Sequence, residues 1–233
     1  MDILSAAWHL LIGMDADLMA IIALSLKVSG LAVLFALILG APVGAALAIW
    51  SFPGRQVLIV IFNSLMALPP VVVGLSVYLL LSRSGPLGSW GILFTPKAMI
   101  IAQTALIFPI IVALTREAVK PVFREYRGLL ISLNASPLLV LRTVLWDARF
   151  GVVTALLAGF GRAVAEVGAV LIVGGNIDGL TRVMTTTIAL ETSKGNLELA
   201  MALGIVLIVL ALVMNALIYS ISRIGLRFQE VRE

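Results

Sequence analysis

The stretch TREAVKPVFREYRGLLISLNASPLLVLRTVLWDAR, residues Thr115 to Arg149, decides how the rest of this chain is organised. It is polar and basic, whereas long apolar segments lie on both sides of it. Because so many charges are costly inside a lipid bilayer, the stretch must lie on one face of a membrane. It is too regular in pattern for a linker and too short for a catalytic domain. A membrane protein with one such loop is expected to be driven by a partner outside the membrane.

The composition is that of a polytopic membrane protein. Of 233 residues, 61% are hydrophobic and 12% are charged, and the mean hydropathy is +1.16. Cysteine is absent, which excludes disulfides, thiol catalysis and thiolate metal sites. The single histidine, His9, is expected in a short interfacial segment without a chemical role, so no catalytic or metal site is predicted. The net charge of +4 marks a cytoplasmic face and does not indicate nucleic-acid binding.

Five apolar segments reach or nearly reach the length of about 20 residues that a membrane-spanning helix needs. The predicted fold class is therefore an all-α polytopic membrane protein with five transmembrane helices and a cytoplasmic helix–turn–helix. The spans are expected at about 18–50, 57–81, 98–119, 150–173 and 199–221, with the cytoplasmic loop at 115–149. This arrangement gives an external segment at 1–17, a transmembrane domain at 18–221 and a cytoplasmic tail at 222–233. No basic region or cleavage site of a signal peptide precedes the first span.

Basic residues in the connecting segments predict the orientation, because cytoplasmic loops carry an excess of lysine and arginine. One set of segments holds ten of them: Arg55, Arg116, Lys120, Arg124, Arg127, Arg142, Arg149, Arg223, Arg227 and Arg232. The opposite set holds four: Arg83, Lys97, Arg182 and Lys194. The C-terminus and the basic loop are therefore expected in the cytoplasm. The N-terminus and the segments 82–96 and 174–197 are expected on the outer face.

The basic loop is expected to hold two helices joined by a pinned corner. Residues 122–133 have helical character, and Asn134 follows them as a residue type that tolerates the left-handed conformation that ends helices. Ser136 and Pro137 are typical of an N-cap and the first position of a second helix, which ends near Ala148. Such a corner suits the docking of a partner. A plain amphipathic linker lying on the membrane surface is the alternative that the residues leave open.

The segment LNASPLLVLRTVLWDA, which begins at Leu133, resembles the cytoplasmic signature loop of permease subunits of type I ABC importers. In that family, the loop forms a short coupling helix that fits a groove on the ATPase subunit. The family's glutamate falls on Gly128 here, so its contacts are either absent or shifted to Glu125. The family's glycine falls on Asn134, which can still make the turn. The resemblance implies that the residues that contact the ATPase are Glu125, Tyr126, Arg127, Gly128, Leu133, Asn134, Ala135, Ser136 and Pro137.

Two further parts of the chain are similar to permeases for molybdate, tungstate and sulfate. They are GFGRAVAEVGAVLIVGGN at 159–176 and LSRSGPLG at 81–88, the latter followed by TPKAMIIAQTALIFPIIVALT at 95–115. Together they look most like the tungstate-type branch. The resemblance implies an importer for a tetrahedral oxyanion, tungstate or molybdate, in the plasma membrane of a prokaryote. It also implies a homodimer that forms the path, a pair of ATPase subunits that bind ATP and Mg, and an external binding protein. The chain itself is then expected to bind no cofactor and to contact lipid.

Arg162 and Glu166 are the charges expected deep within a span, and their i,i+4 spacing predicts that they share one helix face. Two interpretations stay open. The pair could lock the fourth span to a neighbour, or Arg162 could attract a dianion in the path while Glu166 limits its trapping. Pro69 and Pro70 must break or kink the second span, and the freed backbone groups could line the path. Asn176 follows two glycines that end the fourth span and could form part of an outer gate.

The chain lacks a G-x-x-x-x-G-K-[ST] phosphate loop, so it is not expected to hydrolyse ATP itself. Two other function classes remain as alternatives, a self-sufficient anion channel and an intramembrane enzyme. An enzyme would need a nucleophile with a base, or a metal site, at membrane depth, where only Arg162 and Glu166 offer charge. A channel would conduct ions without any ATPase, which distinguishes it from a permease.

Overall fold

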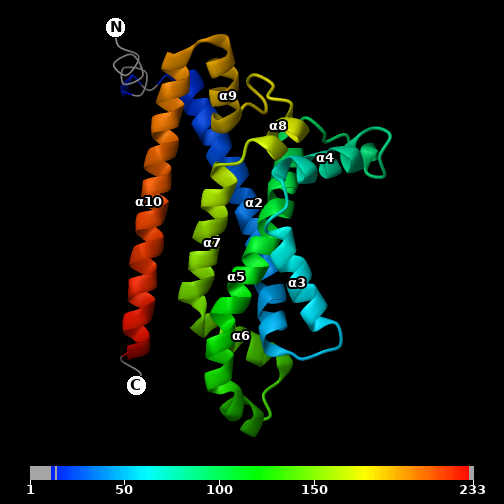
Figure 1. Cartoon of the computed structure of the whole chain (residues 1–233), viewed down its shortest axis with the longest axis vertical. Helices are drawn as coiled ribbons and strands as arrows, with labels where there is room; N and C mark the ends of the chain where they lie inside the picture. The colour runs from blue at the N-terminus through cyan, green and yellow to red at the C-terminus, as the bar shows by residue number, and fades with distance from the viewer. Residues whose placement is uncertain (1–11, 14, 231–233) are drawn as a thin grey trace. The chain divides into compact units, whose positions relative to one another are not determined.

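The computed structural model describes residues 12–13 and 15–230, and every regular element within them is helical (Figure 1). The elements are α2 (Ala16–Ile49), α3 (Arg55–Leu65), α4 (Pro70–Leu81), the 3₁₀ turn η1 (Gly88–Trp90), α5 (Pro96–Ser132), α6 (Pro137–Asp147), α7 (Arg149–Val164), α8 (Gly168–Gly174), α9 (Met184–Lys194) and α10 (Leu197–Glu230). The predicted interfacial position of His9 lies outside the described residues.

Three described helices, α2, α5 and α10, are long and apolar enough to cross a membrane. Two bent pairs, α3 with α4 and α6 with α7, raise the number of candidate spans to as many as five. The all-helical membrane fold expected from the sequence is therefore confirmed. Asp15 caps the start of α2, because its carboxylate accepts a hydrogen bond from the backbone N–H of Leu18 at 3.0 Å.

The segment 57–81 is not one continuous helix, because α3 ends at Leu65 and α4 begins at Pro70. The break predicted at Pro69 and Pro70 is confirmed: Pro69 is extended, with φ −62° and ψ 126°, and Pro70 begins α4. A proline lacks the N–H that continues a helix and also disfavours helical geometry in the residue before it. Two consecutive prolines therefore separate α3 from α4.

The helical character predicted for 122–133 is confirmed as far as Ser132, but these residues do not form a helix of their own, because α5 runs without interruption from Pro96 to Ser132. Pro121 lies inside α5, although a proline removes one helical hydrogen bond. Val119 and Val122 on either side of it are buried, so burial of apolar surface offsets the lost bond. The third span and the first half of the basic loop are thus one helix.

The fourth span, predicted as continuous over 150–173, is also interrupted. α7 ends at Val164 and α8 begins at Gly168. The segment 174–197 contains α9, a helix that the sequence analysis missed. Its residues Met184, Thr185, Thr186, Thr187 and Glu191 are buried, so this part of the segment is not a solvated loop.

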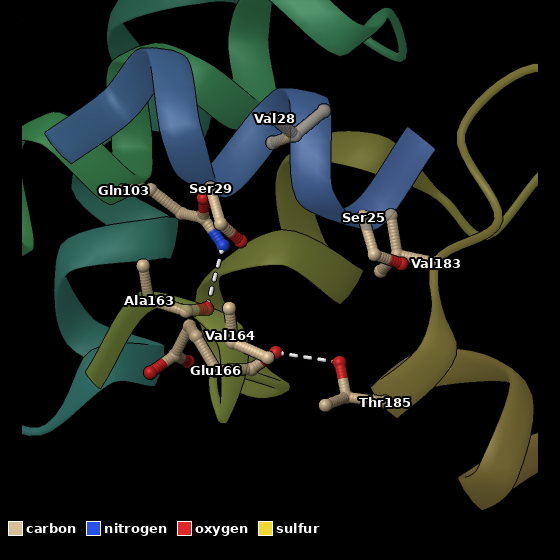
Figure 2. A pocket seen from close by; sticks show the side chains of 9 residues that line it. All are labelled: Ser25, Val28, Ser29, Gln103, Ala163, Val164, Glu166, Val183 and Thr185. Atoms are coloured by element: carbon tan, nitrogen blue, oxygen red, sulfur yellow. Dashed lines mark hydrogen bonds between the residues drawn. The ribbon is translucent and has the colours of Figure 1, made fainter. Parts of the chain in front are cut away.

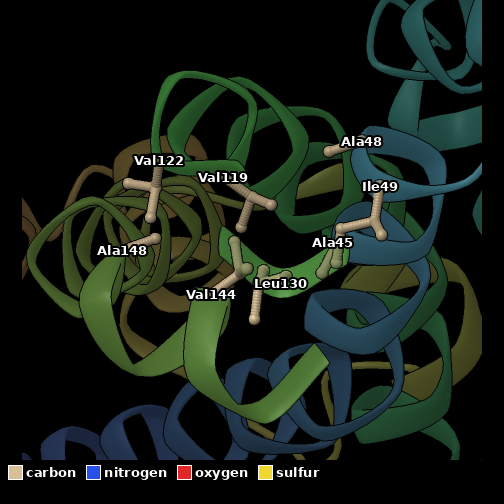
Figure 3. Close-up of a cluster of buried hydrophobic side chains, with 8 residues drawn as sticks. All are labelled: Ala45, Ala48, Ile49, Val119, Val122, Leu130, Val144 and Ala148. Carbon is tan, nitrogen blue, oxygen red and sulfur yellow. The ribbon is translucent and has the colours of Figure 1, made fainter. Parts of the chain in front are cut away.

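The chain divides into two compact units, each with its own core. Among the described residues, the first unit comprises 12–13, 15–32, 69–105 and 160–213, and the second comprises 33–68, 106–159 and 214–230. Leu18, Met184, Ala202 and Leu203 form a core cluster of the first unit. A cluster of the second unit joins α2, α5 and the segment from α6 to α7 (Figure 3): Ala45, Ala48, Ile49, Val119, Val122, Leu130, Val144 and Ala148.

Within the first unit, α4 packs closely against α8. A Cβ atom added to Gly74 would lie 2.6 Å from the Cα of Ala169, a backbone atom that cannot turn away. We therefore expect Gly74→Ala to lower the free energy of unfolding by about 2 kcal/mol through overpacking. Gly30→Ala is the matched control, because a Cβ there meets nothing within 4 Å and alanine favours helix. Thermal unfolding of the purified protein measures both variants, and an unchanged Tm for Gly74→Ala would contradict the packing described.

Candidate functional site

The corner between α5 and α6 is built as its sequence predicts. Asn134 has a left-handed backbone with φ 47°, and its N–H donates to the carbonyl of Ile131 at 3.0 Å. The N–H of Ala135 donates to the carbonyl of Leu130, also at 3.0 Å, which closes the end of α5. The hydroxyl of Ser136 accepts from the N–H of Leu139 at 3.4 Å and caps α6. The turn is thus held by local bonds at both helix ends.

The corner carries large apolar side chains that the chain itself leaves exposed. Leu133 is 67% exposed and Leu138 is 75% exposed. We define the corner surface as these two residues with Leu129, Ile131, Leu139 and Trp146, all of them exposed. Contiguous exposed apolar surface usually marks a site of interaction with a protein or a membrane.

The sequence-predicted coupling residues divide into an exposed and a half-buried group. The exposed group is Glu125, Arg127, Gly128, Leu133, Asn134, Ser136 and Pro137. Tyr126 and Ala135 are half-buried and pack against the core cluster of the second unit. A Cβ added to Gly128 would meet nothing within 4 Å, so the position of the family's glutamate faces open space in this chain.

The end of α6 carries an interaction that the sequence analysis missed. The guanidinium of Arg149 lies 5.4 Å from the ring centre of Trp146 and 4.8 Å from that of Phe150. It also donates to the carbonyl of Trp146 at 3.0 Å, near the bend of 72° between α6 and α7. The sequence signal for this cation–π contact is the spacing of the residues: the arginine follows the tryptophan by three positions and directly precedes the phenylalanine.

Arg162 and Glu166 form an ion pair, but not on one continuous helix face as predicted. The Nη1 of Arg162 lies 2.5 Å from the Oε2 of Glu166, and Glu166 sits in the break after α7 has ended at Val164. Its other carboxylate oxygen accepts from the N–H of Ala169 at 3.0 Å and so caps α8. Glu166 is 3% exposed, whereas the side chain of Arg162 is 35% exposed. The carboxylate of Glu166 therefore neutralises the charge of Arg162 and caps the start of α8.

Three other elements of the first unit supply polar groups around this break, as Figure 2 shows. Gln103 of α5 donates from its amide to the carbonyl of Ala163 at 3.0 Å. The hydroxyl of Thr185 in α9 donates to the carbonyl of Glu166 at 2.6 Å. Ser25 of α2 accepts from the N–H of Met184 at 2.8 Å. Sequence analysis did not find these partners, since they lie far apart along the chain.

The remaining predicted path residues take different places in the fold. Asn176 has φ 50° directly after the end of α8, and its amide donates to the carbonyl of Thr186 at 3.4 Å. Pro70 begins α4. The next residue, Val71, lies beside Gly168 at the start of α8, because a Cβ atom added to Gly168 would lie 2.7 Å from the side chain of Val71. Pro70 and Glu166 therefore flank the start of α8, whereas Asn176 follows its end.

Comparison with known proteins identifies the family. No family profile matches the chain. The chain is 44% identical over 218 residues to a probable anion ABC transporter permease protein of Haloferax volcanii, covering 91% of each chain. It is 41% identical over 217 residues to the tungstate uptake system permease protein TupB of Peptoclostridium acidaminophilum, covering 93% of this chain and 95% of the relative. The molybdenum transport system permease protein ModB of Escherichia coli is 31% identical over 199 residues, which cover 82% and 87% of the two chains.

The chain belongs to the permease family of ABC transporters. Its place is in the branch that contains these anion, tungstate and molybdenum permeases. The permease is accordingly a multi-pass membrane protein and a transport component of an uptake system, and the alternative of an intramembrane enzyme is dropped. Membership also implies an ATPase and a binding protein as partners of the permease.

α9 of the permease ends on a charged cluster. The buried carboxylate of Glu191 accepts from the ammonium of Lys194 at 2.9 Å and from the amide of Asn196 at 3.0 Å. The hydrogen bond from Lys194 is the main cause that holds the pKa of Glu191 below its ordinary value of 4.5; the bond from Asn196 also lowers the pKa, and burial opposes both.

This arrangement predicts a pH-dependent stability difference between the permease and its Glu191→Gln variant. Because the folded-state pKa of Glu191 lies below its unfolded-state pKa, its stabilising contribution is present above the unfolded-state pKa. The contribution is lost as the pH falls through the folded-state pKa. We expect Glu191→Gln to lower Tm by a few degrees at pH 7, and the difference from the parent protein to shrink as the pH falls. A Tm difference that persists unchanged at pH 3 would contradict the ion pair as its cause.

Proposed function

We propose that the chain is the membrane subunit of an ATP-driven importer for a tetrahedral oxyanion, with tungstate as cargo and molybdate as the second candidate. The supporting observation is that the named tungstate permease is more similar to this chain, and over more of its length, than the named molybdenum permease. Arginine inside the apolar chain suits an anionic cargo, because it stays charged in any environment.

The corner surface is proposed as the docking site for the ATPase. Its support is the combination of exposed leucines with a backbone that is pinned by Asn134 and Ser136. A rigid apolar knob that enters a groove transmits force better than a flexible loop, because little of the movement is lost in bending. ATP binding by the partner draws the two corners of a dimer together and opens the path outward, and hydrolysis reverses the change. ATP and Mg are bound by the ATPase, and this chain binds no cofactor.

The path is proposed to pass Arg162 and Glu166, with Pro69, Pro70 and Asn176 at its breaks and outer gate. The support for Arg162 is its 35% exposed side chain, which can meet a passing anion while it stays paired with Glu166. A net-neutral pair attracts a dianion only weakly, so the cargo is not trapped. The alternative is that the pair only locks the break between α7 and α8, in which case a stable variant without either charge should still transport.

The assembly is proposed to be a homodimer in the prokaryotic plasma membrane, with the N-terminus outside and the C-terminus and corner in the cytoplasm. Up to five spans per chain are few for a complete path, which a symmetric pair would double. Since the chain has no cysteine, single cysteines can be introduced without background. Ser132→Cys should react with an impermeant maleimide only from the cytoplasmic side, and Ser84→Cys only from outside. The reverse pattern would refute the orientation.

Uptake by the reconstituted transporter tests the function. The permease, its ATPase and its binding protein are placed in proteoliposomes, and uptake of tungstate, molybdate and sulfate is measured with and without ATP. We expect ATP-dependent uptake of tungstate at a lower concentration than is needed for molybdate. ATP-dependent uptake of sulfate alone would refute the cargo. Anion flux through the permease without ATPase or ATP would favour the channel alternative.

A further inference from the structure

Beside the break between α7 and α8, nine residues of the first unit enclose a small polar cavity (Figure 2). They come from α2, α5, the end of α7 with the break, and the start of α9: Ser25, Val28, Ser29, Gln103, Ala163, Val164, Glu166, Val183 and Thr185. The cavity has room for about one water molecule. A cavity of this size stays dry when its lining is apolar, but this lining carries hydroxyl, amide and carboxylate groups.

Most of the polar groups in this lining already have partners. Ser25 accepts from Met184 and donates to the carbonyl of Ile21. The hydroxyl of Thr185 donates to the carbonyl of Glu166, and the carboxylate of Glu166 accepts from Arg162 and from the N–H of Ala169. These groups leave little capacity for a ligand.

Gln103 differs from its neighbours, because one end of its amide is unsatisfied. Its Nε2 donates to the carbonyl of Ala163. Because a carbonyl oxygen can only accept a hydrogen bond, this contact fixes the positions of the amide nitrogen and oxygen of Gln103. The Oε1 of Gln103 is consequently held in place, and it is buried without a hydrogen-bond partner among the described residues. Gln103 as a whole is 3% exposed. A buried acceptor that lacks a donor is costly, so native proteins supply one.

A second polar partner for a ligand is Ser29. It is 3% exposed, it lines the same cavity from α2, and its hydroxyl can both donate and accept. Figure 2 shows the side chains of Ser29 and Gln103 beside one another at the end of the cavity near Ala163. A water molecule needs two or more polar partners at such a site, and these two residues supply them.

We propose that Gln103 and Ser29 bind one internal water molecule, and that this water ties α2 and α5 to the break between α7 and α8. The water donates to the Oε1 of Gln103 and exchanges a hydrogen bond with the hydroxyl of Ser29. Gln103 in turn holds the carbonyl of Ala163, the residue before the last one of α7. The water therefore acts on the break through Gln103, which is a positioning residue. This inference is independent of the cargo and of the ATPase, and it goes beyond the proposed function.

An experimental structure of the purified permease, at a resolution that shows ordered water, tests the binding site directly. We expect a peak within about 2.7–3.2 Å of both the Oε1 of Gln103 and the hydroxyl of Ser29. The same peak should be missing in Ser29→Ala. No peak in the parent protein, or a direct bond from another group to the Oε1, would overturn the proposal.

Hydrogen exchange followed by mass spectrometry tests the effect on the break. Ser29→Ala should speed exchange in the peptide that covers 160–170 and leave exchange in α10 unchanged. Ser76→Ala is the matched control, because that hydroxyl is exposed and bonds within its own helix to the carbonyl of Val72 at 2.9 Å. Equal exchange at 160–170 in Ser29→Ala and in the parent protein would overturn the role of the water in holding the break.

Thermal unfolding of Ser29→Ala, Gln103→Met and the double variant tests whether the two residues act together. If one water joins them, the double variant should lose less in Tm than the sum of the two single losses, because either change already removes the bridge. Additive losses would overturn the proposal. The Tm of the parent protein should also be the same in sodium chloride as in choline chloride. A higher Tm in sodium alone would show that a cation binds there, which would also overturn it.

Discussion

Replacement of Asn134 by proline is expected to lower ATP-driven uptake by about tenfold or more, which corresponds to about 1.4 kcal/mol of lost coupling. Proline fixes φ near −65° and has no N–H, whereas Asn134 has φ 47° and donates to the carbonyl of Ile131. The corner therefore cannot keep its shape, and the corner surface changes its position relative to the helix that precedes it. Uptake and ATP hydrolysis by the reconstituted transporter are measured together, since hydrolysis should persist while uptake falls.

Asn134→Gly is the matched control for this prediction. Glycine adopts positive φ without strain and keeps the N–H, so uptake should stay near that of the parent protein. Glycine is also the residue that the family resemblance leads one to expect at this position. If Asn134→Pro transports normally, the corner does not couple the two subunits. If both variants lose uptake equally, the side chain of Asn134 matters and the turn does not.

Replacement of Glu166 by alanine is expected to have the largest effect on stability. The change leaves Arg162 without its partner and the N–H of Ala169 without an acceptor. Removing one partner of a buried ion pair costs about 3–5 kcal/mol, and the partial exposure of Arg162 places this case near the lower value. For a chain of this size, a loss of about 3 kcal/mol lowers Tm by about 6–12 °C. Thermal unfolding of the purified permease measures it.

The double variant Arg162→Gln with Glu166→Gln separates the two interpretations of the pair. It leaves no unpaired charge, and the new amide oxygen at 166 can still accept from the N–H of Ala169, so most of the lost Tm should return. If Arg162 attracts the anion in the path, uptake stays low in this stable variant. If the pair only locks the break, uptake returns with stability. An unchanged Tm in Glu166→Ala would contradict both interpretations.

Prolines in the apolar segments illustrate how far local sequence can predict this fold. Pro42, Pro109 and Pro121 lie inside α2 and α5, whereas Pro69 and Pro70 end one helix and begin another. A single proline removes one hydrogen bond, which surrounding packing can offset. Two in succession remove two bonds and restrict the residues before them, so the break follows from the sequence alone.

The helix α9 shows the opposite case, in which sequence pattern gave no sufficient signal. Four of its residues are threonine, which has low helix propensity, so the local sequence gives no clear signal for a helix. In the fold, Thr185 bonds to the carbonyl of Glu166, and the N–H of Met184 bonds to Ser25, which lies 159 residues away. Tertiary partners of this kind override the local preference, and no window of sequence contains them.

The sequence by itself determined the membrane class, the helical fold and the corner at Asn134. Hydropathy, capping residues and the left-handed preference of asparagine act over one or two turns of chain, so each can be read where it occurs. The pairing of Arg162 with Glu166 was readable from their spacing, but only the tertiary structure decided that Glu166 lies beyond the end of α7 and caps α8, and that Gln103 reaches Ala163. The physical reason is that a buried polar group must find a partner, and Ser25, Gln103 and Thr185 find partners that lie far away along the chain.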